Sequence, residues 1–369
     1  MKRRNHPPNY SRREAIKLGA AAVGFTAFAR SFPLLADDVI SKAKIVPSGE
    51  MVSGAKYKKE GPVRIGFSNG FSGNTWRTEC LYSVKKEAAQ HKDLADFIIV
   101  DGQGDITKQV SDIENLVSQN VDAILCIPNS GSAVAPALRN AAKQGIITVP
   151  FNLPVDGEGW TTYNGTDPQK KGFELGKWLR NAVGESAKIV ALGGLPGNSY
   201  TAAAWAGAQK AMEGSQIQVL AFRDAYWEED RAKIVMADLI AAYPEIEGVW
   251  CDGSQVGAGA MKALLDAKRP LVPVTGDDYN GLLKLYDQQA ASQPKFKIGL
   301  LSEPTWESVV ALRAALKLLQ GEDVPKRQII EPQLITSENY QNYVRRDLAD
   351  GVFVDTDFSD AELKALFKS

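Results

Sequence analysis

The stretch Val63–Glu79, VRIGFSNGFSGNTWRTE, decides the fold because an apolar run ends there in a loop that is both polar and aromatic. Alternating apolar residues from Val63 to Phe67 predict a strand, and a helical pattern runs from Trp76 to about Gln90. Ligands of open α/β sheets collect at the carboxyl ends of the strands, where helix amino termini offer unpaired N–H donors. The stretch therefore predicts a β-loop-α unit whose loop lies at a ligand-binding edge.

Length, charge and the scarcity of reactive side chains limit the possible functions. A chain of 369 residues favours two domains, and a net charge of -1 gives no attraction to nucleic acid or anionic lipid. Two histidines and three cysteines without CxxC spacing leave little from which to build a metal site, a triad or a disulfide framework. The chain also lacks a GxGxxG after its first strand, a phosphate loop and a GxSxG elbow. We therefore expect no enzyme, no metal and no cofactor.

Strands and helices alternate along the rest of the chain, which is typical of a parallel α/β architecture. In the first half, four predicted strands end in polar or turn-forming residues, at Ser68, Asp101, 128–129 and Asn152. The pattern restarts at about residue 187, and its strands again end in polar or aromatic residues. Two similar halves with facing carboxyl edges would enclose a cleft.

The amino-terminal residues 1–36 are typical of an export signal, with a basic start and an apolar segment too short to span a membrane. Residues 11–17, SRREAIK, resemble the twin-arginine translocation motif, with Ala where a bulky apolar residue is frequent. Cleavage after Ala29 or Ala36 fits the small residues there, and the alternative is a basic tail before an apolar helix. We expect residues 37–61 to form a linker and the mature protein to act in the periplasm.

Five motifs together are similar to a known family. FSNGFSGNTWRTE, DGQGD, AILCIPNS, ITVPFN and VTGDD follow successive predicted strands in this order. In order and spacing they resemble the periplasmic sugar-binding proteins of ABC importers, of the ribose and galactose type, over residues 62–335. The resemblance implies two Rossmann-like α/β lobes with parallel sheets, joined by a three-segment hinge and closing on one sugar. It implies these boundaries: an N-terminal lobe of 62–165 and 303–330, a C-terminal lobe of 166–302 and 331–340, and a C-terminal extension of 341–369.

The resemblance also implies a ligand site at the strand ends. Indoles would cover the C–H faces of a sugar ring, while amides, carboxylates and a guanidinium would bind its hydroxyls. The chain departs from the family pattern at Asn152, where a charged pair is usual, and at Ala202, Ala204 and Ser302. The predicted ligand-binding residues are Ser68, Asn74, Trp76, Arg77, Asn152, Trp227, Asp252 and Asp278.

Several of these residues have a purely structural alternative. Trp76 fits a core position of its helix, and Asp252 and Asp278 fit the caps of the helices that follow them. Asn152 fits a turn before Pro154, and Arg77 fits a surface ion pair of little energy.

We expect a monomeric solute-binding protein that captures a monosaccharide or polyol and delivers it to an ABC transporter permease. The alternative is a sugar-sensing protein that feeds a membrane receptor or kinase and uses the same fold. A sugar-responsive repressor would instead carry a helix-turn-helix where this chain has the export signal. Residues 360–367 predict a short amphipathic helix with Leu363, Leu366 and Phe367 on one face, packing over the hinge or one lobe.

Overall fold

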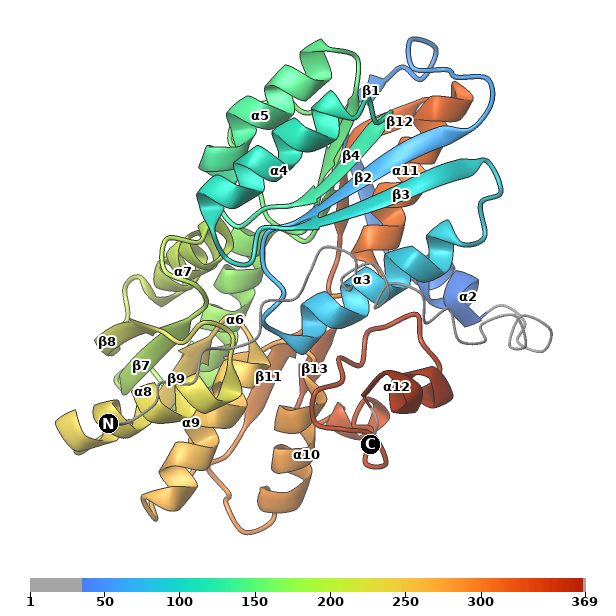
Figure 1. Ribbon diagram of the computed structural model, residues 1–369. Helices are drawn as coiled ribbons and strands as arrows, with labels where there is room; N and C mark the ends of the chain where they lie inside the picture. The colour runs from blue at the N-terminus through green and yellow to red at the C-terminus, as the bar shows by residue number, and fades with distance from the viewer. Residues whose placement is uncertain (1–34, 368–369) are drawn as a thin grey trace, which may run out of the picture.

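The structure, a computed structural model, describes residues 35–367, which form two α/β lobes (Figure 1). The predicted export signal of residues 1–36 lies outside this range except for its last two residues. Among the helices of this range, none combines the length and the apolarity that crossing a membrane requires.

The first lobe is built on a parallel sheet with the strand order β3-β2-β4-β5. Apolar residues point to both faces of each strand, so helices cover both sides: α4 and α5 on one face, α3 and α11 on the other (Figure 1). The strands are β2 (Val63–Asn69), β3 (Leu94–Asp101), β4 (Ala123–Ile127) and β5 (Ile147–Pro150), and the helices are α3 (Thr75–Ala88), α4 (Ile106–Ser118), α5 (Gly131–Lys143) and α11 (Glu307–Gln320).

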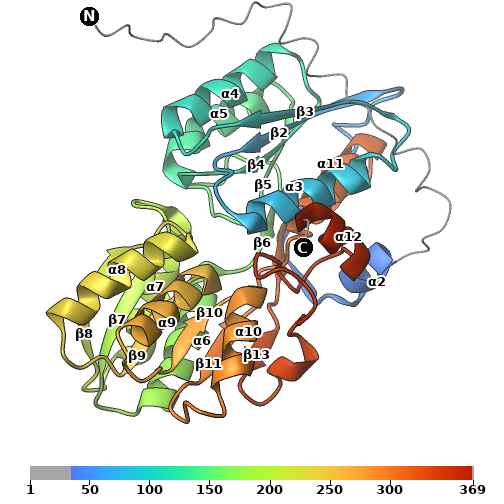
Figure 2. The same cartoon turned by 60° about the horizontal axis from the view of Figure 1, so that its bottom comes forward.

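The second lobe contains a six-stranded sheet with the order β13-β11-β10-β9-β7-β8, in which the edge strand β13 runs antiparallel to β11. Its strands are β7 (Lys188–Gly193), β8 (Gln218–Asp224), β9 (Gly248–Cys251), β10 (Val274–Gly276), β11 (Ile298–Leu301) and β13 (Leu334–Thr336). Its helices are α6 (Pro168–Val183), α7 (Ser199–Met212), α8 (Glu229–Ala242), α9 (Ser254–Asp266) and α10 (Asn280–Gln289). The carboxyl ends of both parallel sheets face the space between the lobes (Figure 2).

A third sheet, β1-β12-β6, joins β12 (Val324–Ile330) and β6 (Tyr163–Gly165) with the strand β1 (Ile45–Val52). The prediction of a linker over 37–61 is therefore wrong for residues 37–52, because β1 pairs with β12 from Ile45 to Val52 and the helix α2 (Leu35–Lys42) precedes it. The sequence IVPSGEMV concealed this strand, since an exposed edge strand is held by main-chain pairing and needs few buried side chains.

The carboxyl-terminal residues pass from the second lobe to the first. After the short 3-10 helix η3 (Tyr340–Asn342), the chain lies along α10 and ends in α12 (Asp360–Phe367) beside α3 (Figure 2). The predicted amphipathic helix is confirmed: Leu363 is buried against Leu348 and Val352. The segment contacts both lobes, whereas the prediction placed it over the hinge or one lobe.

Candidate functional site

A cavity of about 50 Å³ lies between the lobes, at the carboxyl ends of their strands. Both lobes contribute to its wall: the starts of α3, α7 and α9, the loops after β5, β8, β9, β10 and β11, and the carboxyl-terminal segment. The lining residues are Asn74, Trp76, Arg77, Asn152, Leu153, Tyr200, Trp227, Asp252, Gln255, Asp277, Glu303 and Phe353.

The first-lobe wall is the start of α3, where the opening stretch of the sequence places three predicted residues. Asn74 caps the helix, and its Oδ1 accepts a hydrogen bond of 3.0 Å from the backbone N of Arg77. The Trp76 indole is buried in the core on one side and lines the cavity on the other, so it is a core residue whose predicted role in binding stays a prediction. Its Nε1 donates to the backbone oxygen of Glu303 over 2.7 Å.

Arg77 is buried beside this indole and does not make the predicted alternative, a surface ion pair. Its Nη1 donates to Asn69 Oδ1 over 2.8 Å, and the rest of the guanidinium adjoins the cavity. Burial lowers the pKa of Arg77 to about 10, which still leaves it protonated at neutral pH. A fixed cation with spare N–H donors thus faces the cleft.

The second-lobe wall is organised by Trp227, whose Nε1 donates to Asp252 Oδ1 over 3.0 Å. Its backbone has φ 54, a left-handed conformation that is uncommon for a bulky residue and clusters at functional sites. Gly194 lies against the indole, since a Cβ there would come within 2.1 Å of Trp227 Cε2. The Tyr200 ring packs edge-on to the indole at 6.3 Å.

Asp252 lines the cavity and does not cap α9, whose amino-terminal cap is Gly253 without a side-chain bond. Thr201 Oγ1 donates to its Oδ2 over 2.6 Å. Burial raises the pKa of Asp252 to about 6, so a small change in its surroundings moves its charge within the physiological range.

The predicted ligand residue Asp278 does not reach the cavity, and its neighbour Asp277 does. Asp278 is fully buried and accepts hydrogen bonds from the backbone N of Glu303 (2.8 Å) and of Asp355 (2.6 Å). It does not cap α10 either, since that helix has Tyr279 as its cap and no side-chain bond. Consecutive side chains at a strand end point in different directions, and the sequence could not tell which of the two faces the cleft.

Of the predicted ligand residues Ser68 and Asn152, only Asn152 reaches the cavity. Ser68 is fully buried within the first lobe, where Gln109 Nε2 donates to its hydroxyl over 3.3 Å, and it does not line the cavity. Asn152 does line the cavity, in a left-handed conformation with φ 62. Its Nδ2 donates to Glu303 Oε1 (2.7 Å) and Glu307 Oε2 (3.0 Å), so its amide N–H groups bind protein carboxylates.

Glu303 is the main residue that the prediction missed, although its neighbour Ser302 was singled out. Its Oε2 accepts from the Tyr200 hydroxyl over 2.7 Å and from the ammonium of Lys171, both in the second lobe. Burial opposes the charge of Lys171, but the carboxylates of Glu303, Asp277 and Asp278 together outweigh burial and raise the pKa of the ammonium. Glu303 therefore ties the hinge to both lobes at the wall of the cavity.

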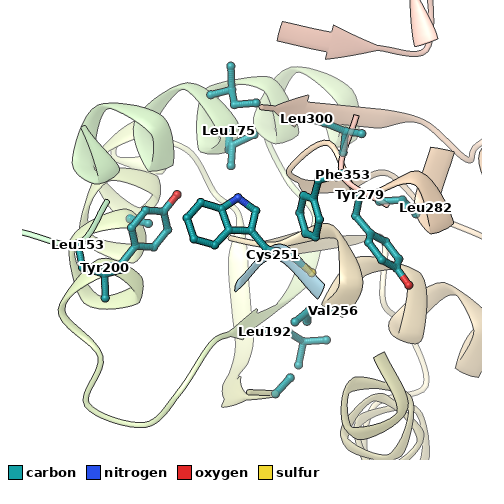
Figure 3. Close-up of a cluster of buried hydrophobic side chains, with 14 of the residues drawn as sticks. Leu153, Leu175, Leu192, Tyr200, Cys251, Val256, Tyr279, Leu282, Leu300 and Phe353 are labelled. Atoms are coloured by element: carbon teal, nitrogen blue, oxygen red, sulfur yellow. The ribbon is translucent and has the colours of Figure 1, made fainter. Parts of the chain in front are cut away.

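Phe353, Tyr200, Gln255 and Leu153 also line the cavity without having been predicted. Figure 3 shows Phe353 beside Tyr279 and, further along the same cluster, Tyr200 beside Leu153. Gln255 follows a predicted strand end closely enough for sequence to have suggested it, whereas Phe353 belongs to the carboxyl-terminal segment and carries no local signal.

Two lobes that enclose a small polar and aromatic cavity at facing strand ends define a solute-binding protein. The chain belongs to the family described as periplasmic binding protein domain, whose model matches residues 65–323. This confirms the resemblance and the fold class that the sequence predicts.

Relatives within this family span most of the chain. It is similar to the ribose import binding protein of Bacillus subtilis, with 28% identity over 264 residues, 70% of this chain and 84% of that protein. It is also similar to the xylitol-binding protein of Mycolicibacterium smegmatis, with 28% identity over 239 residues, 64% of this chain and 67% of that protein. Among solved structures, an ABC transporter solute binding protein from Mycobacterium smegmatis with bound glycerol has a TM-score of 0.68 at 26% identity and covers 78% of this chain and 98% of that one.

Proposed function

We propose that this protein captures a monosaccharide or polyol between its lobes and delivers it to the permease of an ABC importer. The observation that carries the proposal is the composition of one small cavity. Trp76 and Trp227 reach it from opposite lobes, and Arg77, Asp252 and Asp277 provide its polar rim. The names of two relatives, a ribose import binding protein and a xylitol-binding protein, support the same ligand class.

This set of side chains matches the surface of a polyol. Indole faces cover C–H groups, which adds about 0.5–1.5 kcal/mol per aromatic contact beyond the area buried. Ionised carboxylates accept from ligand hydroxyls and the guanidinium donates to ligand oxygens, each contributing on the order of 1.5–3 kcal/mol. The polar rim therefore sets specificity. A ligand that leaves one of these charged groups without a hydrogen bond in the closed cleft would lose a comparable binding free energy.

The size of the cavity favours a small ligand. A cavity needs roughly 10–15 Å³ to hold one water molecule. A volume of about 50 Å³ therefore corresponds to a few waters and suits a compact polyol better than an oligosaccharide.

Binding would act on the relative position of the lobes. A ligand held by α3 of one lobe and by the β8 and β9 ends of the other gains contacts to both only in the closed state. The closed, loaded form is then the form that a permease can distinguish from the empty protein.

We further propose that the protein is exported by the twin-arginine route and is a monomer; its action outside the cytoplasm is in keeping with its family. Replacing Arg12 and Arg13 by Lys should retain the precursor in the cytoplasm, as followed by cell fractionation. Light scattering of the mature protein checks the oligomeric state, and a stable dimer would contradict it.

The ligand class is tested by a thermal-shift screen of the mature protein against pentoses, hexoses, linear polyols and sugar acids. A ligand at about a hundred times its dissociation constant stabilises the fold by about 2.7 kcal/mol. The same concentration of an amino acid mixture is the matched control. A flat response to every carbohydrate, or a response to the amino acids alone, would refute the proposed ligand class.

A further inference from the structure

The wall of the cavity contains a residue from beyond the family match. The match ends at residue 323, and Phe353 lies thirty residues further along the chain. Phe353 lines the cavity and is itself only 1% exposed, so its ring is held firmly in place. Residues 350–357 are named the C-terminal wall here.

Main-chain hydrogen bonds attach the C-terminal wall to the second lobe. The backbone N of Asn280 donates to Val352 O over 2.8 Å, and the backbone N of Val354 donates to Asp278 O over 3.2 Å. Between these bonds, Phe353 forms an isolated antiparallel bridge with Tyr279, and the two rings pack 5.7 Å apart. The Tyr279 ring therefore supports Phe353 from behind.

The same segment is attached to the first lobe through α3, the helix that carries Trp76 and Arg77. The backbone N of Phe353 donates to Glu79 Oε1 over 2.8 Å. The Asp357 carboxylate accepts from Ser83 Oγ, and Lys86 Nζ donates to the Asp357 backbone oxygen over 3.1 Å.

The hinge segment after β11 provides a further attachment. The backbone N of Thr305 donates to Asp355 O over 3.1 Å, and Trp306 Nε1 donates to Asp355 Oδ1 over 3.0 Å. The C-terminal wall is thus fixed to both lobes and to a segment that joins them, and Phe353 cannot retreat without breaking these bonds.

We propose that the C-terminal wall is a third wall of the ligand site and that Phe353 is a specificity-determining residue that limits the length of the ligand. The inference rests on the proposed function and names the class it admits: a monosaccharide or a linear polyol of similar length, with its C–H groups against the ring. A ligand extended by a second sugar unit would collide with Phe353, because the Tyr279 ring packs against its ring and Glu79 holds its main chain.

The test compares Phe353→Ala with the wild-type mature protein by isothermal titration calorimetry. The probes are the best monosaccharide or polyol of the screen and the same unit extended by one glycosyl residue. We expect Phe353→Ala to bind the small probe about tenfold or more weakly, since it loses an aromatic contact. We also expect it to bind the extended probe, which the wild type rejects.

Phe358→Ala is the matched control, because Phe358 lies in the same region and packs against Lys86 away from the cavity. It should keep the ligand profile of the wild type. Phe353→Leu retains an apolar side chain against Tyr279 and serves where the alanine variant does not fold; it should show the same two shifts to a smaller extent.

A wild type that binds no carbohydrate overturns the proposed function and this inference with it. A wild type that binds the small probe while Phe353→Ala and Phe353→Leu keep its ligand profile overturns the inference alone. Binding of the extended probe by the wild type also overturns the inference alone.

Discussion

Two groups of buried carboxylates lie around the cleft. They differ in how many of their hydrogen-bond acceptor positions are filled by donors of the protein itself. An ionised carboxylate has about four acceptor positions. Glu303 fills them with protein donors: Asn152 and Thr166 at Oε1, Lys171 and Tyr200 at Oε2. Such a carboxylate anchors the fold and has no acceptor left for a ligand.

The carboxylates of Asp252 and Asp277 form the second group, and protein donors fill only part of their acceptor positions. Asp252 accepts from Thr201 and Trp227, and Asp277 accepts from the backbone N–H groups of Ser254 and Tyr279. Both line the cavity, so a ligand hydroxyl can use the remaining lone pairs. Neither charge nor access to the cavity separates a binding residue from an anchoring one, since Glu303 lines the cavity as well. The number of protein donors does.

The largest expected effect concerns the anchoring group. Lys171→Met should reduce the free energy of unfolding by about 3–5 kcal/mol, because it leaves the buried Glu303 carboxylate without its cation. Urea unfolding of the ligand-free protein measures this. Lys177→Met is the control, because Lys177 is on the same helix, 60% exposed, and 4.0 Å from Glu174. Equal, small losses in the two variants would contradict the anchoring role of Glu303.

The adjacent residues Asp277 and Asp278 allow a sharper test of the same comparison. Asp277→Asn should weaken ligand binding by about 10–100-fold, since a hydrogen bond to a charged group contributes about 1.5–3 kcal/mol. Its unfolding free energy should stay equal or rise, because a desolvated charge is removed. Calorimetric titration with the best ligand measures the affinity, and urea unfolding measures the unfolding free energy.

Asp278→Asn should show the reverse pattern. Its two oxygens accept from the backbone N of Glu303 and of Asp355, and an amide keeps only one acceptor oxygen for them. We expect a loss of about 1–3 kcal/mol of stability with ligand affinity nearly unchanged. If Asp278→Asn lost affinity and Asp277→Asn did not, the original sequence-based choice of Asp278 would be correct and the assignment made from the cavity wrong.

This one-residue difference shows what the sequence could predict. The order of strands and helices predicted the lobes. The family resemblance then implied a site whose residues Asn74, Trp76, Arg77, Asn152, Trp227 and Asp252 line the cavity, where their role in binding stays a prediction. The sequence located the strand ends but not the directions of consecutive side chains. It therefore selected Asp278, whereas its neighbour Asp277 lines the cavity, and it missed Glu303, which lines the cavity next to Ser302, a position noted only as a departure from the family pattern.

Long-range pairing set the second limit. The strand β1 is largely exposed and exists because its main chain pairs with β12, more than 270 residues away. Phe353 likewise reaches the cavity through bonds to Glu79 and to the segment around Tyr279. Neither position carries a local pattern, so periodicity and motif spacing cannot reveal it.

The smallest expected effect is a pH dependence of ligand affinity. It distinguishes Asp252 and Asp277 from the anchoring carboxylate Glu303. Burial raises the pKa of both Asp252 and Asp277 to about 6. The Lys171 ammonium lowers the pKa of Asp277, and the Glu303 carboxylate raises it. Ligand hydroxyls donate to the ionised forms, so affinity should fall severalfold as the pH decreases from about 7.5 to about 5.

The stability of the ligand-free protein should respond to these two groups in the opposite direction. Their pKa values are higher in the folded than in the unfolded state, so between about pH 6 and pH 4 the folded state binds more protons and this contribution to the unfolding free energy rises as the pH falls. Asp277→Asn removes one of the groups, and its difference from the wild type in urea unfolding and in calorimetric affinity isolates the effect at each pH. Affinity that is constant over this range in the wild type would mean that neither carboxylate accepts from the ligand in its ionised form, and both would then belong with Glu303 among the anchoring residues.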